Sequence, residues 1–295
     1  MVPASGASSS RRVLYCHGGG YTSCTPAEYR GFTTRLAASI GSPVFIFDYR
    51  KAPECGFPAA VDDAEAALRY VATHGPLTGR DGDPRSHASE IILMGDSAGG
   101  GLALGLLIRL QRLAKAAPEG RPPPHGAARL RCVTISAYTD LLCSTPTYES
   151  RAWFESTKKG DVCFSGGNPD QASADLSRTD ALLICSQSFS ADQDREYGRQ
   201  WAANYVPAAV TDTPEAARHP EAAPFYSSDA QLGALPPTLM IVGDEEQMLF
   251  ETTDLVSRAT KAGASVTLSV YPRMWHVWPM YSEGCGSQSQ FYAKI

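Results

Sequence analysis

Short apolar segments alternate along the chain with longer segments in which apolar residues recur every three to four positions. The short segments are rich in β-branched and aromatic residues and predict strands at 12–16, 43–48, 90–94, 130–136, 238–242 and 265–271. The longer segments predict helices at 26–40, 59–74, 98–115, 193–206 and 248–262, with a weaker helix after Val277. Buried strands that alternate with helices predict an α/β fold, with a mostly parallel sheet flanked by helices.

The alternation breaks in the second half of the chain. Residues 145–236 are rich in Ser, Asp, Gly and Pro, and their periodicity is weak outside the helix at 193–206. A connection of that length inside a compact domain normally carries structure of its own. We therefore expect a single domain over residues 1–295, in which residues 145–236 form a cap-type insertion.

Composition and charge narrow the classes of function. The chain has 295 residues, 43% of them hydrophobic, and a formal net charge of −5, so neither nucleic acid nor an anionic membrane is an expected partner. The N-terminus has no apolar leader, and no apolar stretch reaches the ~18 uncharged residues of a membrane span, which predicts a cytoplasmic protein. The eight cysteines form no C-x-x-C pair and no zinc-like cluster, so we expect reduced thiols and no metal site.

The sequence around Ser97 carries the clearest chemical signal. The segment IILMGDSAGGGLALGLL places Ser97 in a G-x-S-x-G pattern between an apolar strand and an Ala/Leu/Gly helix. Small flanking residues permit the sharp turn that presents a nucleophilic hydroxyl at a helix N-terminus. We predict that Ser97 is such a nucleophile; the simpler alternative is a glycine-rich turn that only caps the helix.

A second glycine-rich segment, HGGG at residues 17–20, follows the first predicted strand. Without β-carbons, its backbone N–H groups can approach a substrate at the C-terminal edge of the sheet. We assign the N–H groups of Gly18 and Gly19, joined by that of Ala98, to an oxyanion hole, and we expect His17 to orient this loop. A flexible glycine turn is the alternative.

A nucleophilic serine needs a general base and an acid that orients the base. Of the six histidines, His276 follows the last predicted strand and therefore reaches the same edge of the sheet as Ser97. Three consecutive carboxylates, Asp244, Glu245 and Glu246, follow the strand at 238–242, and their residue types alone do not separate them.

These motifs, in this order, resemble those of the hormone-sensitive-lipase-like esterases of the α/β-hydrolase fold. YRKAPE at 49–54, FPAA at 57–60 and AYTDL at 137–141 are also similar to that family's patterns, and the resemblance extends from about residue 11 to about residue 278. It implies an α/β-hydrolase domain. The family's catalytic carboxylate stands fifth in a V/A-G-x-x-[E/D]-x-L pattern, which favours Glu246 over the alternative Asp244. We expect Glu245 to be exposed to solvent.

The resemblance further implies a serine carboxylesterase that hydrolyses short to medium acyl esters, small-molecule substrates, through an acyl-enzyme on Ser97 and without a metal or cofactor. Alternatives are a non-catalytic small-molecule receptor of the same fold, which the retained His276 disfavours, and an amide or formamide hydrolase. Family members carry further strands and cap helices before HGGG, whereas sixteen residues precede His17. We therefore expect those N-terminal strands and cap helices to be absent.

Overall fold

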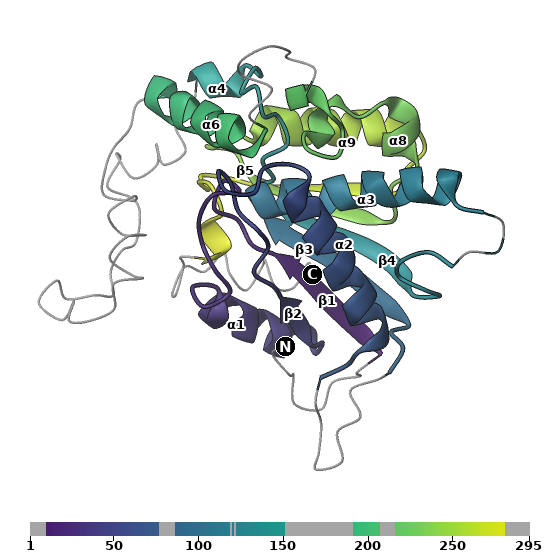
Figure 1. The fold of residues 1–295 in the computed structure, drawn as a ribbon. Helices are drawn as coiled ribbons and strands as arrows, with labels where there is room; N and C mark the ends of the chain where they lie inside the picture. Colours follow the sequence, from purple (N-terminus) through teal and green to yellow (C-terminus); the bar gives the residue numbers. More distant parts are fainter. Residues whose placement is uncertain are drawn as a thin grey trace, which may run out of the picture.

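A six-stranded parallel sheet with helices on both faces forms the body of the molecule (Figure 1). The computed structural model describes residues 10–76, 86–118, 120, 122–150, 191–206 and 216–280. The strands are β1 (Arg11–Cys16), β2 (Val44–Ile46), β3 (Glu90–Asp96), β4 (Arg129–Ile135), β5 (Thr238–Gly243) and β6 (Val266–Tyr271). The helices of eight or more residues among those described are α1 (Arg30–Ile40), α2 (Ala59–Thr73), α3 (Ala98–Ala116), α6 (Ala191–Tyr205) and α9 (Leu249–Lys261).

The predicted α/β class is confirmed, and the strands and helices differ from the predictions mainly at their ends. The helix expected from residue 26 begins at Arg30, because the Thr25 N–H donates to the Glu28 carboxylate and closes a turn ahead of it. The strand expected at 43–48 is reduced to β2, which pairs with residues 13–15 of β1 only. After Val277 the described chain forms a 3₁₀ turn, Trp278–Met280, and the remainder of the predicted helix lies outside the described residues.

Alternating side chains divide the core between the two faces of the sheet. On β1, Val13 and Tyr15 join the cluster that includes residues of α1, whereas Leu14 and Cys16 join the cluster that includes α2, α3 and α9. The first thirteen residues of α3 are all buried. Residues 98–108 of this helix are apolar all round, as expected for a segment covered on every side.

The strand order β2-β1-β3-β4-β5-β6 creates a switch point between β1 and β3. From β1 the chain passes through α1 to one side, and from β3 it passes through α3 to the other side. Cys16, the last residue of β1, lies beside Gly95 in parallel register. Ligands of open α/β sheets bind at the carboxyl ends of the strands at such a switch point. Here those ends lead into His17 and Ser97.

The predicted insertion supplies short elements at the carboxyl end of the sheet, where α4 (Thr147–Ser150) and α6 lie together (Figure 1). The helix predicted at 193–206 corresponds to α6. This helix packs on the loop after β1: the Tyr205 and Tyr21 rings stack with centroids 3.7 Å apart, and Trp201 lies against Gly20. Residues 151–190 of the insertion lie outside the described chain.

The described residues also bear on thiols, metals and membranes. Cys16, Cys24, Cys55, Cys132 and Cys143 are free thiols, and the three other cysteines lie outside the described ranges. Across those ranges, no cluster of three or more His, Cys, Asp or Glu side chains is arranged to hold a metal ion. Among the helices described, none is both long and apolar enough to cross a bilayer.

Candidate active site

Ser97 occupies a strained turn between β3 and α3. Its backbone angles are φ 50° and ψ −124°, a region that a non-glycine residue adopts only when its surroundings hold it there. The Ser97 N–H donates to the Ile135 carbonyl over 2.9 Å. A β-carbon on Gly99 would lie 2.0 Å from the Cys16 carbonyl oxygen, so the helix can pack this closely on β1 only with glycine there. The sequence pattern therefore builds the sharp elbow that it predicts.

His276 reaches Ser97 from the loop after β6. The two atoms Nε2 of His276 and Oγ of Ser97 are 3.0 Å apart, and both side chains are buried. The other five histidines all lie in the described chain, and none of them hydrogen-bonds to Ser97 there. His74, for example, caps the C-terminus of α2, as its position before Gly75 suggests.

Glu246 completes a continuous hydrogen-bonded chain with His276 and Ser97. Its Oε2 lies 2.8 Å from His276 Nδ1, and its Oε1 accepts the Gly243 N–H over 2.6 Å. Asp244 instead accepts the Arg273 N–H over 2.6 Å, which fastens the two loops together without touching the imidazole. Glu245 is half-buried, which corrects the expectation that it is exposed.

Sequence reasoning missed Ser136, which joins the acid loop to the histidine loop. It follows β4 at a positive φ of 50°. Its hydroxyl donates to Glu246 Oε1 over 2.8 Å and accepts the Val277 N–H over 3.1 Å. Two features of the sequence could have pointed to Ser136: it ends a predicted central strand, and it directly precedes the AYTDL segment at 137–141.

The loop after β1 is held by a neutral histidine. His17 is fully buried and stacks on Tyr49, with centroids 4.3 Å apart. Its Nδ1 lies 2.8 Å from the Gly18 carbonyl, so this nitrogen carries the proton. Burial lowers the pKa of His17 to about 4, which keeps the ring uncharged at physiological pH. His17 therefore orients the loop, as expected, by holding a carbonyl.

The Gly18 N–H points into the protein and not toward a substrate. It donates to Tyr29 Oη over 2.8 Å and to Asp96 Oδ1 over 3.2 Å. The assignment of Gly18 as an oxyanion donor is therefore incorrect for this geometry, because its proton is already engaged. The error arises because residue type does not fix which way a peptide faces.

The next peptide is held by its carbonyl, which lies 2.8 Å from His17 Nδ1 and 3.4 Å from Tyr49 Oη. The N–H and C=O of a trans peptide point in opposite directions, so the Gly18 carbonyl held by His17 turns the Gly19 N–H away from the imidazole ring. Within the described chain, the N–H groups of Gly19, Gly20 and Ala98 donate to no protein acceptor. Ala98 is the first residue of α3, where an unpaired N–H is normal.

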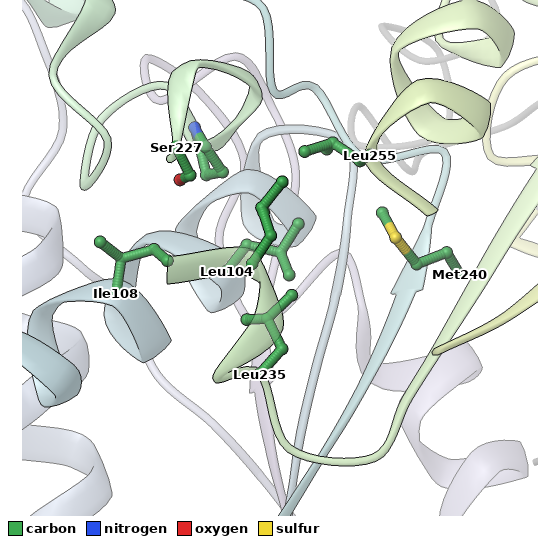
Figure 2. A pocket seen from close by; sticks show the side chains of 8 residues that line it. Leu104, Ile108, Ser227, Leu235, Met240 and Leu255 are labelled. Atoms are coloured by element: carbon green, nitrogen blue, oxygen red, sulfur yellow. The ribbon is translucent and has the colours of Figure 1, made fainter. Parts of the chain in front are cut away.

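The described cavities lie away from Ser97. One of about 10 Å³ lies between α3 and β5 and is lined by apolar residues and Ser227 (Figure 2); a space of that size holds at most about one water molecule. A shallow groove of about 530 Å³ is lined by the first residues of β3 and β4, such as Glu90 and Arg129. This is the amino end of the strands, opposite Ser97.

The fold agrees with comparisons with known proteins. A family model described as the alpha/beta hydrolase fold matches residues 13–280, and this chain belongs to that family. More narrowly, the relatives described next show that it is a hormone-sensitive-lipase-like esterase, a serine hydrolase that acts on ester bonds. An acetyl-hydrolase of Streptomyces hygroscopicus is 33% identical over 271 residues, which cover 92% of this chain and 69% of that protein.

Other relatives support the same family. Hormone-sensitive lipase of Mus musculus is 32% identical over 108 residues, which cover 37% of this chain and 13% of that protein. The crystal structure of an esterase from the bacterial hormone-sensitive lipase family is 29% identical and matches with a TM-score of 0.68 over 99% of this chain and 76% of that one. A mutant of the esterase E40 is 28% identical and matches with a TM-score of 0.69 over the same shares.

Proposed function

We propose that this chain is a serine carboxylesterase for short to medium acyl esters, with Ser97 as nucleophile, His276 as base and Glu246 as orienting acid. The observation that carries the proposal is the unbroken hydrogen-bonded chain from Ser97 through His276 to Glu246, with distances of 3.0 and 2.8 Å. The reaction needs these three side chains and fixed N–H donors for the oxyanion, and no cofactor.

The proposed reaction has two half-cycles. His276 Nε2 takes the Ser97 proton while Oγ attacks the ester carbonyl, and the resulting imidazolium gives that proton to the departing alcohol. Water then attacks the acyl-enzyme with His276 as base again, which releases the acid and restores the serine. The oxyanion is proposed to rest on the N–H groups of Gly19, Gly20 and Ala98, which replaces the donor set expected from sequence.

The size of the acyl group is inferred from two observations. Trp201 of α6 lies against Gly20, so a large aromatic side chain borders the proposed oxyanion loop. The relative from Streptomyces hygroscopicus is named an acetyl-hydrolase. Both favour a small acyl group next to Ser97.

A p-nitrophenyl ester series from acetate to laurate tests this proposal. We expect kcat/KM to be highest for acetate or butyrate, and a fluorophosphonate probe to modify Ser97 in peptide mapping. The matched anilide, p-nitroacetanilide, should react far more slowly. Preference for laurate would overturn the acyl-size inference, faster anilide cleavage would favour an amidase, and tight ligand capture without Ser97 labelling would favour a receptor.

Replacing Ser136 by alanine is expected to lower both activity and stability. Ser136→Ala removes a donor to Glu246 and leaves the buried Val277 N–H unpaired, which costs about 1–3 kcal/mol of unfolding free energy. We expect kcat to fall roughly tenfold as the acid and histidine loops lose their common anchor. Ester kinetics and urea unfolding measure the two effects.

Thr134→Val provides the matched control. Thr134 lies on β4, two residues before Ser136, and is fully buried, and its hydroxyl has no hydrogen-bond partner within the described structure. The variant should keep the wild-type kcat. Equal losses in the two variants would show that general damage to β4, and not the bridge, lowers activity.

A further inference from the structure

Asp96, the residue before the proposed nucleophile, is a buried carboxylate that has no role in the proposed reaction. It is 1% exposed and ends β3. Tyr15 Oη donates to its Oδ1 over 2.8 Å, and Tyr29 Oη donates to its Oδ2 over 2.9 Å. Both tyrosines are themselves buried. A carboxylate in the core is costly unless such donors surround it, so its presence here calls for a reason.

Tyr29 connects this carboxylate to the oxyanion loop. Its hydroxyl accepts the Gly18 N–H over 2.8 Å while it donates to Asp96, and the Gly18 N–H also lies 3.2 Å from Asp96 Oδ1. Gly18 packs so closely on the Asp96 side chain that a β-carbon at this position would lie 2.4 Å from Asp96 Oδ2. Gly18 is therefore held from one side by Asp96 and Tyr29, and its carbonyl is held from the other side by His17.

The charge state of Asp96 fits this arrangement. Burial raises the pKa of Asp96 to about 6, and the hydrogen bonds from Tyr15, Tyr29 and Gly18 oppose that rise. Above that pH the ionised group offers acceptors only, so Tyr29 must direct its proton to Asp96 and its lone pair to Gly18. The Gly18 N–H then always donates to Tyr29, and Tyr29 always donates to Asp96.

We propose that Asp96 and Tyr29 are positioning residues that lock the Gly18 peptide, so that the following Gly19 N–H faces the oxyanion. This inference rests on the proposed esterase function. Asp96 and Tyr29 act through the backbone and do not touch the substrate. Tyr49 Oη donates to the carbonyls of His17 and Gly18 over 2.9 and 3.4 Å, so both peptides are held on their carbonyl side. Release of the Gly18 N–H from Asp96 and Tyr29 removes the hold on the other side and lets the Gly18 and Gly19 peptides rotate.

The test compares Tyr29→Phe and Asp96→Asn with Tyr148→Phe. Tyr148 is a matched control because its buried hydroxyl also donates to a buried carboxylate, that of Glu251, over 3.0 Å, but in α4 and not in the oxyanion loop. The readouts are kcat and KM for p-nitrophenyl acetate, the inhibition constant of a trifluoromethyl ketone that forms a tetrahedral adduct, thermal midpoints, and hydrogen exchange of the Gly18 amide.

Tyr29→Phe and Asp96→Asn should lower kcat by roughly 10- to 100-fold, less than the 10²–10³ that outright removal of an oxyanion donor costs. Binding of the ketone should weaken by a similar factor while KM changes little, because the interaction belongs to the transition state. The Gly18 amide should exchange faster. Tyr148→Phe should retain wild-type kcat, ketone binding and Gly18 exchange even if its thermal midpoint falls.

Unchanged ketone binding and unchanged exchange of the Gly18 amide in Tyr29→Phe and Asp96→Asn would overturn the proposal. So would equal losses in all three variants that follow their thermal midpoints. Failure of the esterase function itself is visible elsewhere, as ester hydrolysis by the wild type no faster than by Ser97→Ala. Exchange of the Gly18 amide can be measured without any enzyme activity. It therefore tests whether Asp96 and Tyr29 hold this peptide whether or not the protein is an esterase.

Discussion

Ser97→Ala is expected to lower kcat for p-nitrophenyl acetate by about 10⁴- to 10⁶-fold, because no other hydroxyl replaces the proposed nucleophile. His276→Ala should cause a loss of similar size. In the proposed mechanism each residue depends on the other, since His276 Nε2, 3.0 Å from Ser97 Oγ, accepts the proton that Ser97 loses. The double variant should therefore be no slower than either single variant. Steady-state kinetics on highly purified protein measures all three.

Additive losses would contradict a shared proton transfer and would separate the roles of Ser97 and His276. Wild-type activity in Ser97→Ala would place the reaction elsewhere in the protein. Circular dichroism is the control for folding. Ser97→Ala deletes one oxygen at a strained position, and we expect its secondary structure to be unchanged.

Glu246→Gln is expected to lower kcat by about 10³- to 10⁴-fold, the loss that follows when a triad acid becomes an amide. Glu246 Oε1 receives two donors, the Gly243 N–H and the Ser136 hydroxyl, so the amide oxygen of glutamine will occupy that position. Its NH₂ group will then face His276 Nδ1 and donate to it. That tautomer carries its proton on Nε2, which can no longer accept one from Ser97.

Asp244→Asn is the control for the neighbouring carboxylate. Its amide oxygen can still accept the Arg273 N–H, so kcat should stay within about threefold of wild type. A large loss in Asp244→Asn with activity retained in Glu246→Gln would make Asp244 the acid. The two variants have the same chemical change two residues apart, so a difference between them reports position alone.

The sequence predicts the parts of this molecule that depend on local pattern. Apolar runs locate the six strands of the described residues, because central strands such as β3 are buried on both faces and are therefore mostly apolar, although the edge strand β6 is partly exposed. The pattern around Ser97 predicts a turn that the structure realises at φ 50°. His276 could be chosen from six histidines because parallel strands bring their carboxyl ends to one edge.

Contacts between distant segments could not be predicted in this way. Ser136 joins loops more than 100 residues away, and Trp201 reaches Gly20 from α6, a helix whose packing partner the sequence pattern does not identify. The orientation of Gly18 depends on Tyr29 and Asp96, which only the fold brings beside it. A residue-by-residue pattern contains neither peptide direction nor packing partners, so these features required coordinates.

The packing of α6 on the loop after β1 has a thermodynamic consequence. Tyr205 stacks on Tyr21, Trp201 covers Gly20, and the Tyr205 carbonyl accepts the Phe57 N–H over 2.6 Å. Displacement of α6 would therefore break contacts with the loop and expose apolar rings to water in the same step. The folding of α6 and the ordering of the loop are therefore linked equilibria. A ligand that binds only the ordered loop also stabilises α6. Conversely, unfolding of α6 lowers the binding free energy of that ligand by the same amount.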